Sequence, residues 1–249
     1  MMTEAIYYTD NSSPALEFAA RELEMRGMTV VQEPDRQVTH LLLGVPCRKD
    51  KQELEELLAK VGDATVFGGF LDRQELAGYD CRDLLTDERY LSENAAITAR
   101  CALRVALQRL PVTLDNCPVL ILGWGRIGKC LAPLLKALGA QVVIALRNAK
   151  DRAMIRALGY EAETLPFPAY ILPRFRVVFN TVPAPVVSAE DLSCCRKGCL
   201  KIELASSPGM EGPDLIDARG LPGRLAPESS GKLIARTVIR MSSRKEVSL

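Results

Sequence analysis

The strongest constraint on this chain is an apolar run, Val119–Leu122, that leads directly into the glycine pattern G-x-G-x-x-G. In a strand–turn–helix each of these glycines has its own task. Gly123 suits a tight turn, Gly125 lets backbone approach a phosphate group, and Gly128 lets the following helix pack closely on the strand. The pattern predicts a buried strand that turns sharply into a helix.

The surrounding sequence strengthens this interpretation, because three spaced glycines also recur by chance. A helix predicted from Arg126 to Leu138 ends at Gly139, and a second apolar strand, Val142–Leu146, follows shortly afterwards. Strand, turn, helix and strand in this order form a βαβ unit. We therefore expect a dinucleotide to lie across the turn. The alternative is a glycine-rich turn that binds no ligand.

The residues after the second strand favour one dinucleotide over the other. An NAD site usually has Asp or Glu there to accept hydrogen bonds from the ribose 2′-hydroxyl, whereas a 2′-phosphate needs cations. This chain has Arg147, Asn148 and Lys150 at that place. The pattern predicts NADP as the cofactor, and the alternative is that these side chains form a solvated loop.

Charge and hydropathy limit the partners. The 249 residues include 32 basic and 31 acidic side chains, a formal net charge of +1, so no global field points to nucleic acid or an anionic membrane. No stretch of about 18 apolar residues runs without charge, and the first ten residues lack the basic and apolar regions of a signal peptide. We expect a cytoplasmic protein with neither nucleic acid nor a membrane as partner.

The cysteines and the single histidine do not form a recognisable metal site. The eight cysteines lie mostly in apolar runs, and we expect them to be reduced thiols. Cys194, Cys195 and Cys199 are clustered, but a structural zinc site needs a fourth ligand, and His40 is far away in sequence. We expect no bound metal, and we interpret His40 as a satisfied strand residue.

The alternation of strands and helices predicts two α/β domains. Residues 1–93 form a small flavodoxin-like domain without a phosphate-binding glycine motif. Residues 94–249 form a doubly wound parallel, Rossmann-type domain. Residues 94–108 belong to a linking helix that starts near Ser92 as N-cap, after an irregular segment at 80–91. The other expected elements are helices at 14–25, 51–61, 151–158, 189–195 and 228–241, and strands at 28–31, 38–43, 64–67, 177–180 and 200–204.

Ligands of such sheets bind beyond the carboxyl ends of the strands. Asn180–Pro183 follows one predicted strand, and Ala205–Gly209 follows another. A third stretch, Gly220–Gly231, has Pro227 and serines at a helix start, whose free N–H groups suit a carboxylate or a phosphate. Turn and capping chemistry explains each stretch separately. Their convergence on one sheet edge favours a binding site.

Six segments in this order and context resemble the family of the NADP-binding, Rossmann-type subunits of dipicolinate synthase. They are Asp83–Ala99, the glycine motif, Ala145–Asn148, Asn180–Pro183, Glu203–Gly209 and Leu221–Gly231. The resemblance covers residues 80–240 and is weak before residue 79. It implies NADP-dependent oxidation of a dihydrodipicolinate-type intermediate of the lysine pathway to dipicolinate, a compound of bacterial spores. It also implies a small dicarboxylate substrate and, as partner, the flavoprotein-like second subunit of dipicolinate synthase. A homo-oligomer is a further expectation.

The motifs and the resemblance together give candidate site residues. Cofactor contacts are expected from Gly123, Gly125, Arg126, Ile127, Gly128, Arg147, Asn148, Lys150, Asn180, Thr181, Val182 and Pro183. Substrate contacts are expected in an interdomain cleft from Asn94, Thr98, Ser206, Ser207, Arg224 and Ser229. No catalytic residue is assigned. None of the six tyrosines has a lysine four residues on, and histidine-dependent and short-chain dehydrogenase chemistries are therefore disfavoured. Oxidation to an aromatic ring is thermodynamically driven, so orientation of the substrate against the nicotinamide could supply much of the rate.

The chain departs from the family pattern at three places. Where the family has Thr-Ala-Glu-Gly-Ala, this chain has Thr-Ala-Arg-Cys-Ala, which places Arg100 near the proposed cleft. The first domain is shorter than expected, and a strand between Asp214 and Pro222 is expected to be missing. Two alternatives therefore stay open. One is a non-catalytic or regulatory dinucleotide-binding relative, and the other is a dehydrogenase of a different small carboxylate.

Overall fold

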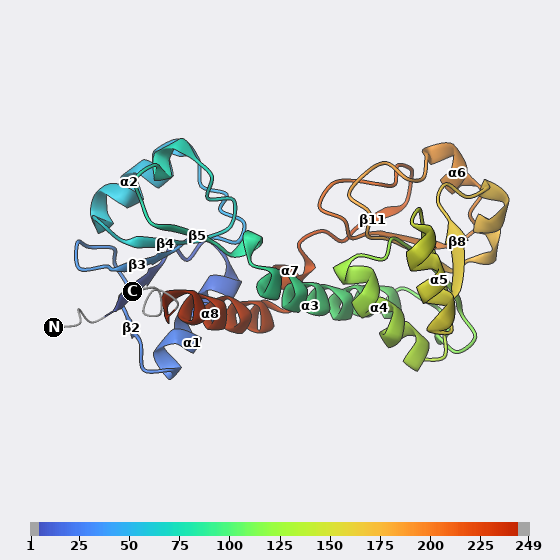
Figure 1. Ribbon diagram of the computed structural model, residues 1–249, viewed down its shortest axis with the longest axis horizontal. Coiled ribbons are helices and arrows are strands. Elements are labelled where there is room, and N and C mark those ends of the chain that lie inside the picture. Colours follow the sequence, from blue (N-terminus) through green and yellow to red (C-terminus); the bar gives the residue numbers. More distant parts are fainter. Residues whose placement is uncertain (1–4, 244–249) are drawn as a thin grey trace. The chain divides into compact units, whose positions relative to one another are not determined.

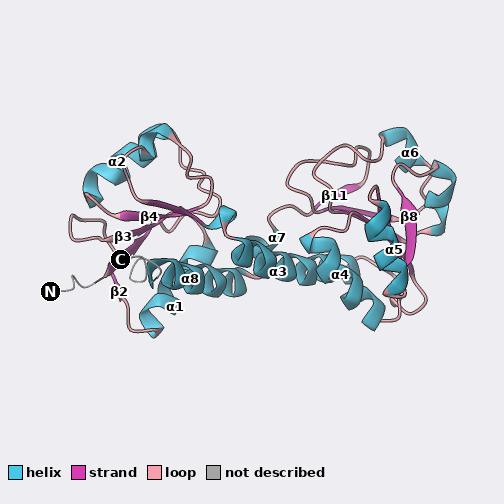
Figure 2. Ribbon diagram, in the orientation of Figure 1, coloured by secondary structure: helices cyan, strands magenta, loops and turns pink. Residues whose placement is uncertain are grey.

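A computed structural model describes residues 5–243, which form two compact α/β units (Figure 1). The first unit comprises the chain up to Asn94 and again from Pro222, and the second comprises Ala95–Leu221. Each unit has a parallel sheet at its centre with helices packed against it, as the colouring by secondary structure makes clear (Figure 2). The α/β class expected from the sequence is confirmed.

The first unit contains a five-stranded parallel sheet in the order β2-β1-β3-β4-β5, which is the flavodoxin-like order. Its strands are β1 (Ile6–Thr9), β2 (Thr29–Val30), β3 (His40–Leu42), β4 (Thr65–Gly68) and β5 (Cys81–Asp83). Neighbouring residues of the central strands face opposite ways. Leu41 and Val66 belong to the apolar cluster that includes the buried side chains of α2 (Lys51–Val61). Leu42 and Phe67 are fully buried on the other face.

The C-terminal helix α8 (Pro227–Ser243) packs along α1 (Pro14–Met25) in the first unit, and Figure 1 shows the two side by side. Their backbones come close at Gly231, where an added Cβ would meet the carbonyl oxygen of Ala15 and lie 2.8 Å from the backbone nitrogen of Ala19. The expectation that the final helix belongs to the second domain was therefore wrong. Its apolar periodicity predicts a buried face but does not say which sheet that face covers.

Helix α3 (Glu88–Leu107) begins earlier than expected, so Ser92 lies inside the helix and is not its N-cap. Asp87 precedes the first turn, and its Oδ1 accepts a hydrogen bond of 2.7 Å from the backbone N–H of Tyr90. Both carboxylate oxygens of Asp87 also accept from the guanidinium of Arg240 on α8, at 2.6 and 3.0 Å. The segment expected to be irregular also contains β5 and a 3₁₀ turn, η2 (Leu84–Thr86), with η1 (Gln74–Leu76) before it.

The second unit contains a six-stranded parallel sheet in the order β11-β10-β9-β6-β7-β8. Counted from β8, its strands come third, second, first, fourth, fifth and sixth along the unit, which is the Rossmann order. They are β6 (Pro118–Leu122), β7 (Gln141–Leu146), β8 (Glu161–Thr164), β9 (Val177–Asn180), β10 (Leu200–Glu203) and β11 (Leu215–Asp217). The helices are α4 (Arg126–Ala137), α5 (Ala149–Ala157), η3 (Ala169–Arg174) and α6 (Ala189–Ser193), and α7 (Leu221–Leu225) follows.

The central strands of this sheet are covered on both faces. Leu120 and Val178 lie in one apolar cluster with Ile171 and Phe175, in and just after η3. The neighbouring residue Ile121 is also fully buried, and α4 and α5 contact the sheet at β6, β7 and β8. Burial on both faces explains why these strands are nearly continuous apolar runs in the sequence.

The strands that the sequence did not predict are short or lie at sheet edges. The strand expected to be missing after Asp214 is present as β11, which pairs with β10 through Ile202 and Ile216. Leu215 and Ile216 of β11 are only half-buried, and Asp217 is exposed. A three-residue edge strand with an exposed acidic residue shows too little apolar alternation to be recognised.

Because the α1–α8 contact has no room for a side chain at Gly231, we predict that Gly231→Ala lowers the free energy of unfolding by about 1–3 kcal/mol. An exposed helix position would gain up to about 1 kcal/mol from the same change. Urea denaturation followed by circular dichroism measures the difference. Gly223→Ala in α7 is the matched control, because an added Cβ there meets nothing within 4 Å. Equal stability of the two variants would contradict the close packing.

Candidate functional site

The glycine turn connects β6 to α4 at the place where the strand order of the second sheet reverses. β6 pairs with β7 on one side and with β9 on the other. Connections leave β7 and β9 in opposite directions across the sheet, and this arrangement opens a crevice beyond the carboxyl ends of the strands. The turn therefore lies at the topological switch point, where open α/β sheets bind their ligands.

The three glycines have the separate tasks that the sequence predicts. Gly123 has φ +97°, and an added Cβ would lie 2.6 Å from Oγ1 of Thr181. At Gly128 an added Cβ would lie 2.6 Å from the carbonyl oxygen of Gly123, so the helix can approach the strand only without a side chain. Gly125 is different, because nothing lies within 4 Å of its Cβ position. It precedes the first turn of α4 and leaves the backbone N–H groups there open to an anion.

The end of β7 presents cations beside this turn. Arg147 and Lys150 are exposed. Asn148 caps α5, because its Oδ1 accepts from the backbone N–H groups of Lys150 at 2.8 Å and Asp151 at 3.2 Å. Arg152 donates to the carbonyl oxygens of Leu146 and Arg147, at 3.2 and 2.5 Å. Asn148 and Arg152 therefore shape the loop, while the side chains of Arg147 and Lys150 extend from it.

A buried carboxylate that the sequence analysis did not single out organises the ends of β9 and β10. Glu203 is 2% exposed. Its Oε1 accepts from the backbone N–H of Ala205 at 2.9 Å, and its Oε2 accepts from those of Gly209 and Met210 at 2.9 and 3.1 Å. The side-chain amide of Asn180 donates to both oxygens, at 2.8 and 3.0 Å. The only signal in the sequence is an acidic residue that ends an apolar strand.

This hydrogen-bond network changes the interpretation of two expected cofactor contacts. Asn180 is fully buried, and its amide also donates to the carbonyl oxygen of Val182 at 3.0 Å. Its side chain is therefore not available to a ligand at the sheet edge, and its role is to position the loop. The hydroxyl of Thr181 donates to the carbonyl oxygen of Leu122 at 2.7 Å, which joins this loop to the glycine turn. Pro183 is exposed at the same edge.

The expected substrate residues are divided between the two units. Ser206 and Ser207 are exposed on the loop that Glu203 holds, at the same edge as the glycine turn. Thr98, also in the second unit, is buried in α3. The other three belong to the first unit, with Asn94 half-buried and Arg224 and Ser229 exposed. The structure thus brings the two serines to the candidate site, and contact of all six with a substrate stays a prediction.

His40 and the cysteines have the structural roles expected of them. The His40 ring packs against Tyr7 and Phe67, and its Nδ1 lies 2.8 Å from Oγ1 of Thr39. Burial, with a smaller effect of the Arg82 charge, lowers the pKa of His40. All eight cysteines are free thiols.

In the cysteine cluster, a hydrogen bond from the Cys199 thiol lowers the pKa of Cys195 to about 7. Within residues 5–243, no three His, Cys, Asp or Glu side chains are grouped so that they could hold a metal ion. None of the helices in the same range has the length and apolar character needed to cross a membrane.

Comparison of sequences gives two relatives with matches over part of the chain. A dipicolinate synthase subunit of Bacillus subtilis (strain 168) is 28% identical over 160 residues, which cover 59% of this chain and 52% of that protein. A glutamyl-tRNA reductase of Helicobacter hepaticus is 27% identical over 113 residues, 43% of this chain and 26% of that protein. The chain thus spans about half the length of the first relative and about a quarter of the second. No protein-family model matches the chain.

Comparison of structures shows the fold over nearly the whole chain. The corresponding dipicolinate synthase subunit from Bacillus halodurans aligns with a TM-score of 0.82 at 23% identity, over 97% of this chain and 98% of that one. A transhydrogenase from Sinorhizobium meliloti aligns with a TM-score of 0.71 at 17% identity, over 97% and 94% of the two chains. The two-unit α/β architecture is therefore shared with these proteins.

Because the Glu203 carboxylate satisfies several buried N–H groups at once, we predict that Glu203→Gln lowers the free energy of unfolding by about 3 kcal/mol. Glutamine keeps the size of the side chain but turns an N–H₂ group toward backbone donors. Chemical denaturation measures the loss, with the exposed Glu211→Gln as control. A Glu203→Gln protein as stable as the control would show that the network is dispensable.

Proposed function

The chain is a homologue of the dinucleotide-binding subunit of dipicolinate synthase, and from this premise we propose that it is an oxidoreductase that binds a nicotinamide dinucleotide at the second sheet. The observation that carries the proposal is the glycine turn at the switch point, where Gly125 leaves the N-terminus of α4 open. The backbone N–H groups of Arg126 and Ile127 would hold the pyrophosphate there. The bound cofactor would supply the acceptor for a hydride from the substrate.

NADP is the form of cofactor that we propose. The first residue after β7 is Arg147, at the place where an NAD site has a carboxylate that accepts from the ribose. Arg147 and Lys150 are both exposed beside the turn, and a 2′-phosphate would gain charge-assisted hydrogen bonds from them. Asn148 would position this loop by capping α5, and Asn180 with Glu203 would position the loop on the other side.

The substrate that we propose is a small dicarboxylate of the dihydrodipicolinate type, oxidised to an aromatic pyridine. Ser206 and Ser207 are exposed hydroxyls at the same sheet edge as the glycine turn and would donate to a carboxylate. Asn94, Thr98, Arg224 and Ser229 remain proposed further contacts. The flavoprotein-like second subunit of dipicolinate synthase is the proposed partner, in the cytoplasm of a spore-forming bacterium. All of these assignments rest on the partial sequence match and on the residues themselves.

A second candidate is a dinucleotide-binding relative without this activity, or one that oxidises another small carboxylate. Arg100 favours this alternative, because it places an exposed base where the family pattern has an acid. Its guanidinium donates to the carbonyl oxygen of Ala96 one turn earlier in α3, at 3.0 Å. A base in place of an acid would alter charge complementarity to a substrate without affecting the glycine turn.

For the cofactor, we predict that Arg147→Asp weakens binding of NADPH by well over tenfold and that of NADH much less. One charge-assisted phosphate contact contributes about 1.5–3 kcal/mol, and a carboxylate would repel the 2′-phosphate. Titration calorimetry with each nucleotide measures the two affinities. Lys197→Asp is the control, because Lys197 is exposed before β10, at the opposite edge of the same sheet. Equal losses for both nucleotides would defeat the NADP assignment.

For the reaction, we predict that the chain produces NADPH and dipicolinate when it is mixed with the flavoprotein-like partner, NADP and freshly generated lysine-pathway intermediate. Absorbance of the reduced nicotinamide and chromatography of the product measure the two. Normal NADPH binding without turnover would favour the non-catalytic relative. Turnover with another member of a carboxylate panel would instead identify a different substrate. Arg100→Glu shows whether the altered position limits activity.

A further inference from the structure

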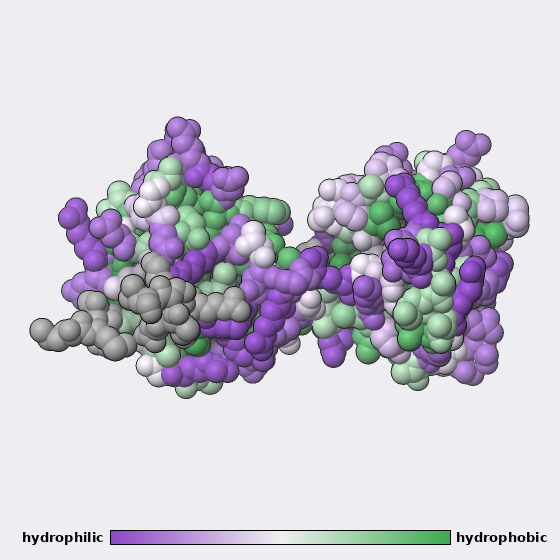
Figure 3. Space-filling model, viewed as in Figure 1, coloured by the Kyte–Doolittle hydropathy of each residue, from purple (hydrophilic) through white to green (hydrophobic). Residues whose placement is uncertain are grey.

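The first unit has a cavity of about 250 Å³ that is lined by residues of α1, α3 and α8. Arg26, at the C-terminal end of α1, is one of four arginines that line it. The others are Arg89 on α3 and Arg236 and Arg240 on α8. Glu93 is the acidic residue among the lining side chains. Figure 3 shows hydrophilic side chains gathered over α3 and the visible part of α8.

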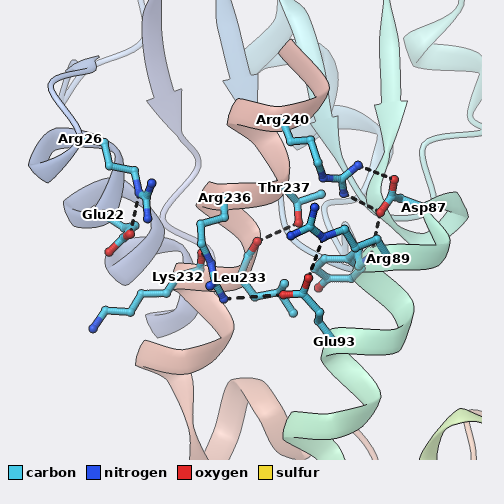
Figure 4. A network of polar contacts seen from close by, with 11 residues as sticks. Glu22, Arg26, Asp87, Arg89, Glu93, Lys232, Leu233, Arg236, Thr237 and Arg240 are labelled. Atoms are coloured by element: carbon cyan, nitrogen blue, oxygen red, sulfur yellow. Dashed lines mark hydrogen bonds and ion pairs between the residues drawn. The ribbon is translucent and has the colours of Figure 1, made fainter. Parts of the chain in front are cut away.

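The spacing of the lining residues concentrates charge on facing helices. Arg89 and Glu93 are one turn apart on α3, as are Arg236 and Arg240 on α8, so each pair shares a helix face. Figure 4 shows Arg89 and Arg236 reaching toward Glu93 from the two helices. Nε of Arg89 lies 2.9 Å from one carboxylate oxygen, and Nη2 of Arg236 lies 3.8 Å from the other.

The four arginines differ in how much of each guanidinium is already in use. Arg240 donates through both terminal nitrogens to Asp87, and this pair joins α8 to the start of α3. Arg26 contacts Glu22 through Nε at 2.7 Å, just as Arg89 contacts Glu93. The terminal nitrogens of Arg26 and Arg89 therefore have no hydrogen-bond partner within the described residues. Arg236 has only the longer ion pair to Glu93 at that end.

We propose that this cavity is a binding site for a small phosphate-type oxyanion, separate from the nucleotide site of the second unit. Guanidinium groups donate two parallel hydrogen bonds to such oxygens, and they do so with fixed geometry. The four lining arginines outnumber Glu93, and they still exceed the acids when Glu22 and Asp87 are included. Glu93 holds Arg89 and Arg236 near each other but supplies one negative charge, which leaves room for a stronger anion.

The size of the cavity limits the ligand class. Pockets for drug-sized molecules occupy about 300–1,000 Å³, so about 250 Å³ suits one or two phosphate groups better than a whole dinucleotide. Phosphate offers more charge and more acceptor oxygens than a carboxylate, and several guanidinium groups can therefore share it. The ligand is inorganic phosphate or pyrophosphate, or the phosphorylated end of a small metabolite.

Titration calorimetry of the full chain with inorganic pyrophosphate, phosphate and malonate tests the proposal. Pyrophosphate should bind more tightly than malonate, and Arg89→Gln combined with Arg236→Gln should weaken pyrophosphate binding by tenfold or more. Glu93→Gln should tighten it several-fold, because a competing negative charge is removed. Addition of a phosphorylated sugar, compared with pyrophosphate, separates a metabolite from a free anion as the source.

The controls separate this site from the nucleotide site. Arg36→Gln changes an exposed arginine outside the cavity and should leave pyrophosphate binding unchanged. Arg147→Asp should also leave it unchanged, even though it impairs NADPH binding. Circular dichroism confirms that each variant is folded. Loss of pyrophosphate binding in Arg147→Asp, an unaffected double arginine variant, weaker binding in Glu93→Gln, malonate as good as pyrophosphate, or no heat at millimolar pyrophosphate would each overturn the proposal.

Discussion

The second unit depends on a close approach of backbone to backbone at the glycine turn. The positions where Gly123 and Gly128 would carry a Cβ are occupied by Thr181 Oγ1 and by the carbonyl oxygen of Gly123, each at 2.6 Å. Any larger residue would push α4 away from β6 and misdirect the helix N-terminus. Gly125 has no such neighbour. Two glycines therefore fix the position of the helix, and the third keeps the space in front of it free, which is the geometry that a pyrophosphate requires.

The opposite side of the crevice depends on electrostatics. An unpaired carboxylate buried beside an anion-binding turn would be costly, and it would repel a phosphate. Glu203 avoids both effects because backbone N–H groups and the Asn180 amide surround its two oxygens. The same hydrogen bonds fix the loop that carries Ser206 and Ser207. One buried charge thus holds the ends of two neighbouring strands in register with the glycine turn.

In the first unit, charge acts at a helix junction. The pair of Asp87 and Arg240 caps α3 and joins it to α8, while Gly231 lets α8 lie directly on α1. Because these contacts fix three helices together, arginines from separate segments of the chain line one cavity. The buried pair serves the architecture, and the more exposed arginines of the same cavity keep donors that the protein does not use itself.

The sequence by itself determined the local structure: the glycine turn, the βαβ unit, helices such as Pro14–Met25 and Lys51–Val61, and the cations after β7. These follow from short-range patterns of apolar residues, glycines and caps, which are set within about one or two turns of chain. Only the tertiary structure decided that α8 packs on α1, that Glu203 is buried by Asn180, and that Asp87, far along the chain, receives Arg240. Each of these is a contact between distant segments, and periodicity shows that a face is buried without showing what buries it.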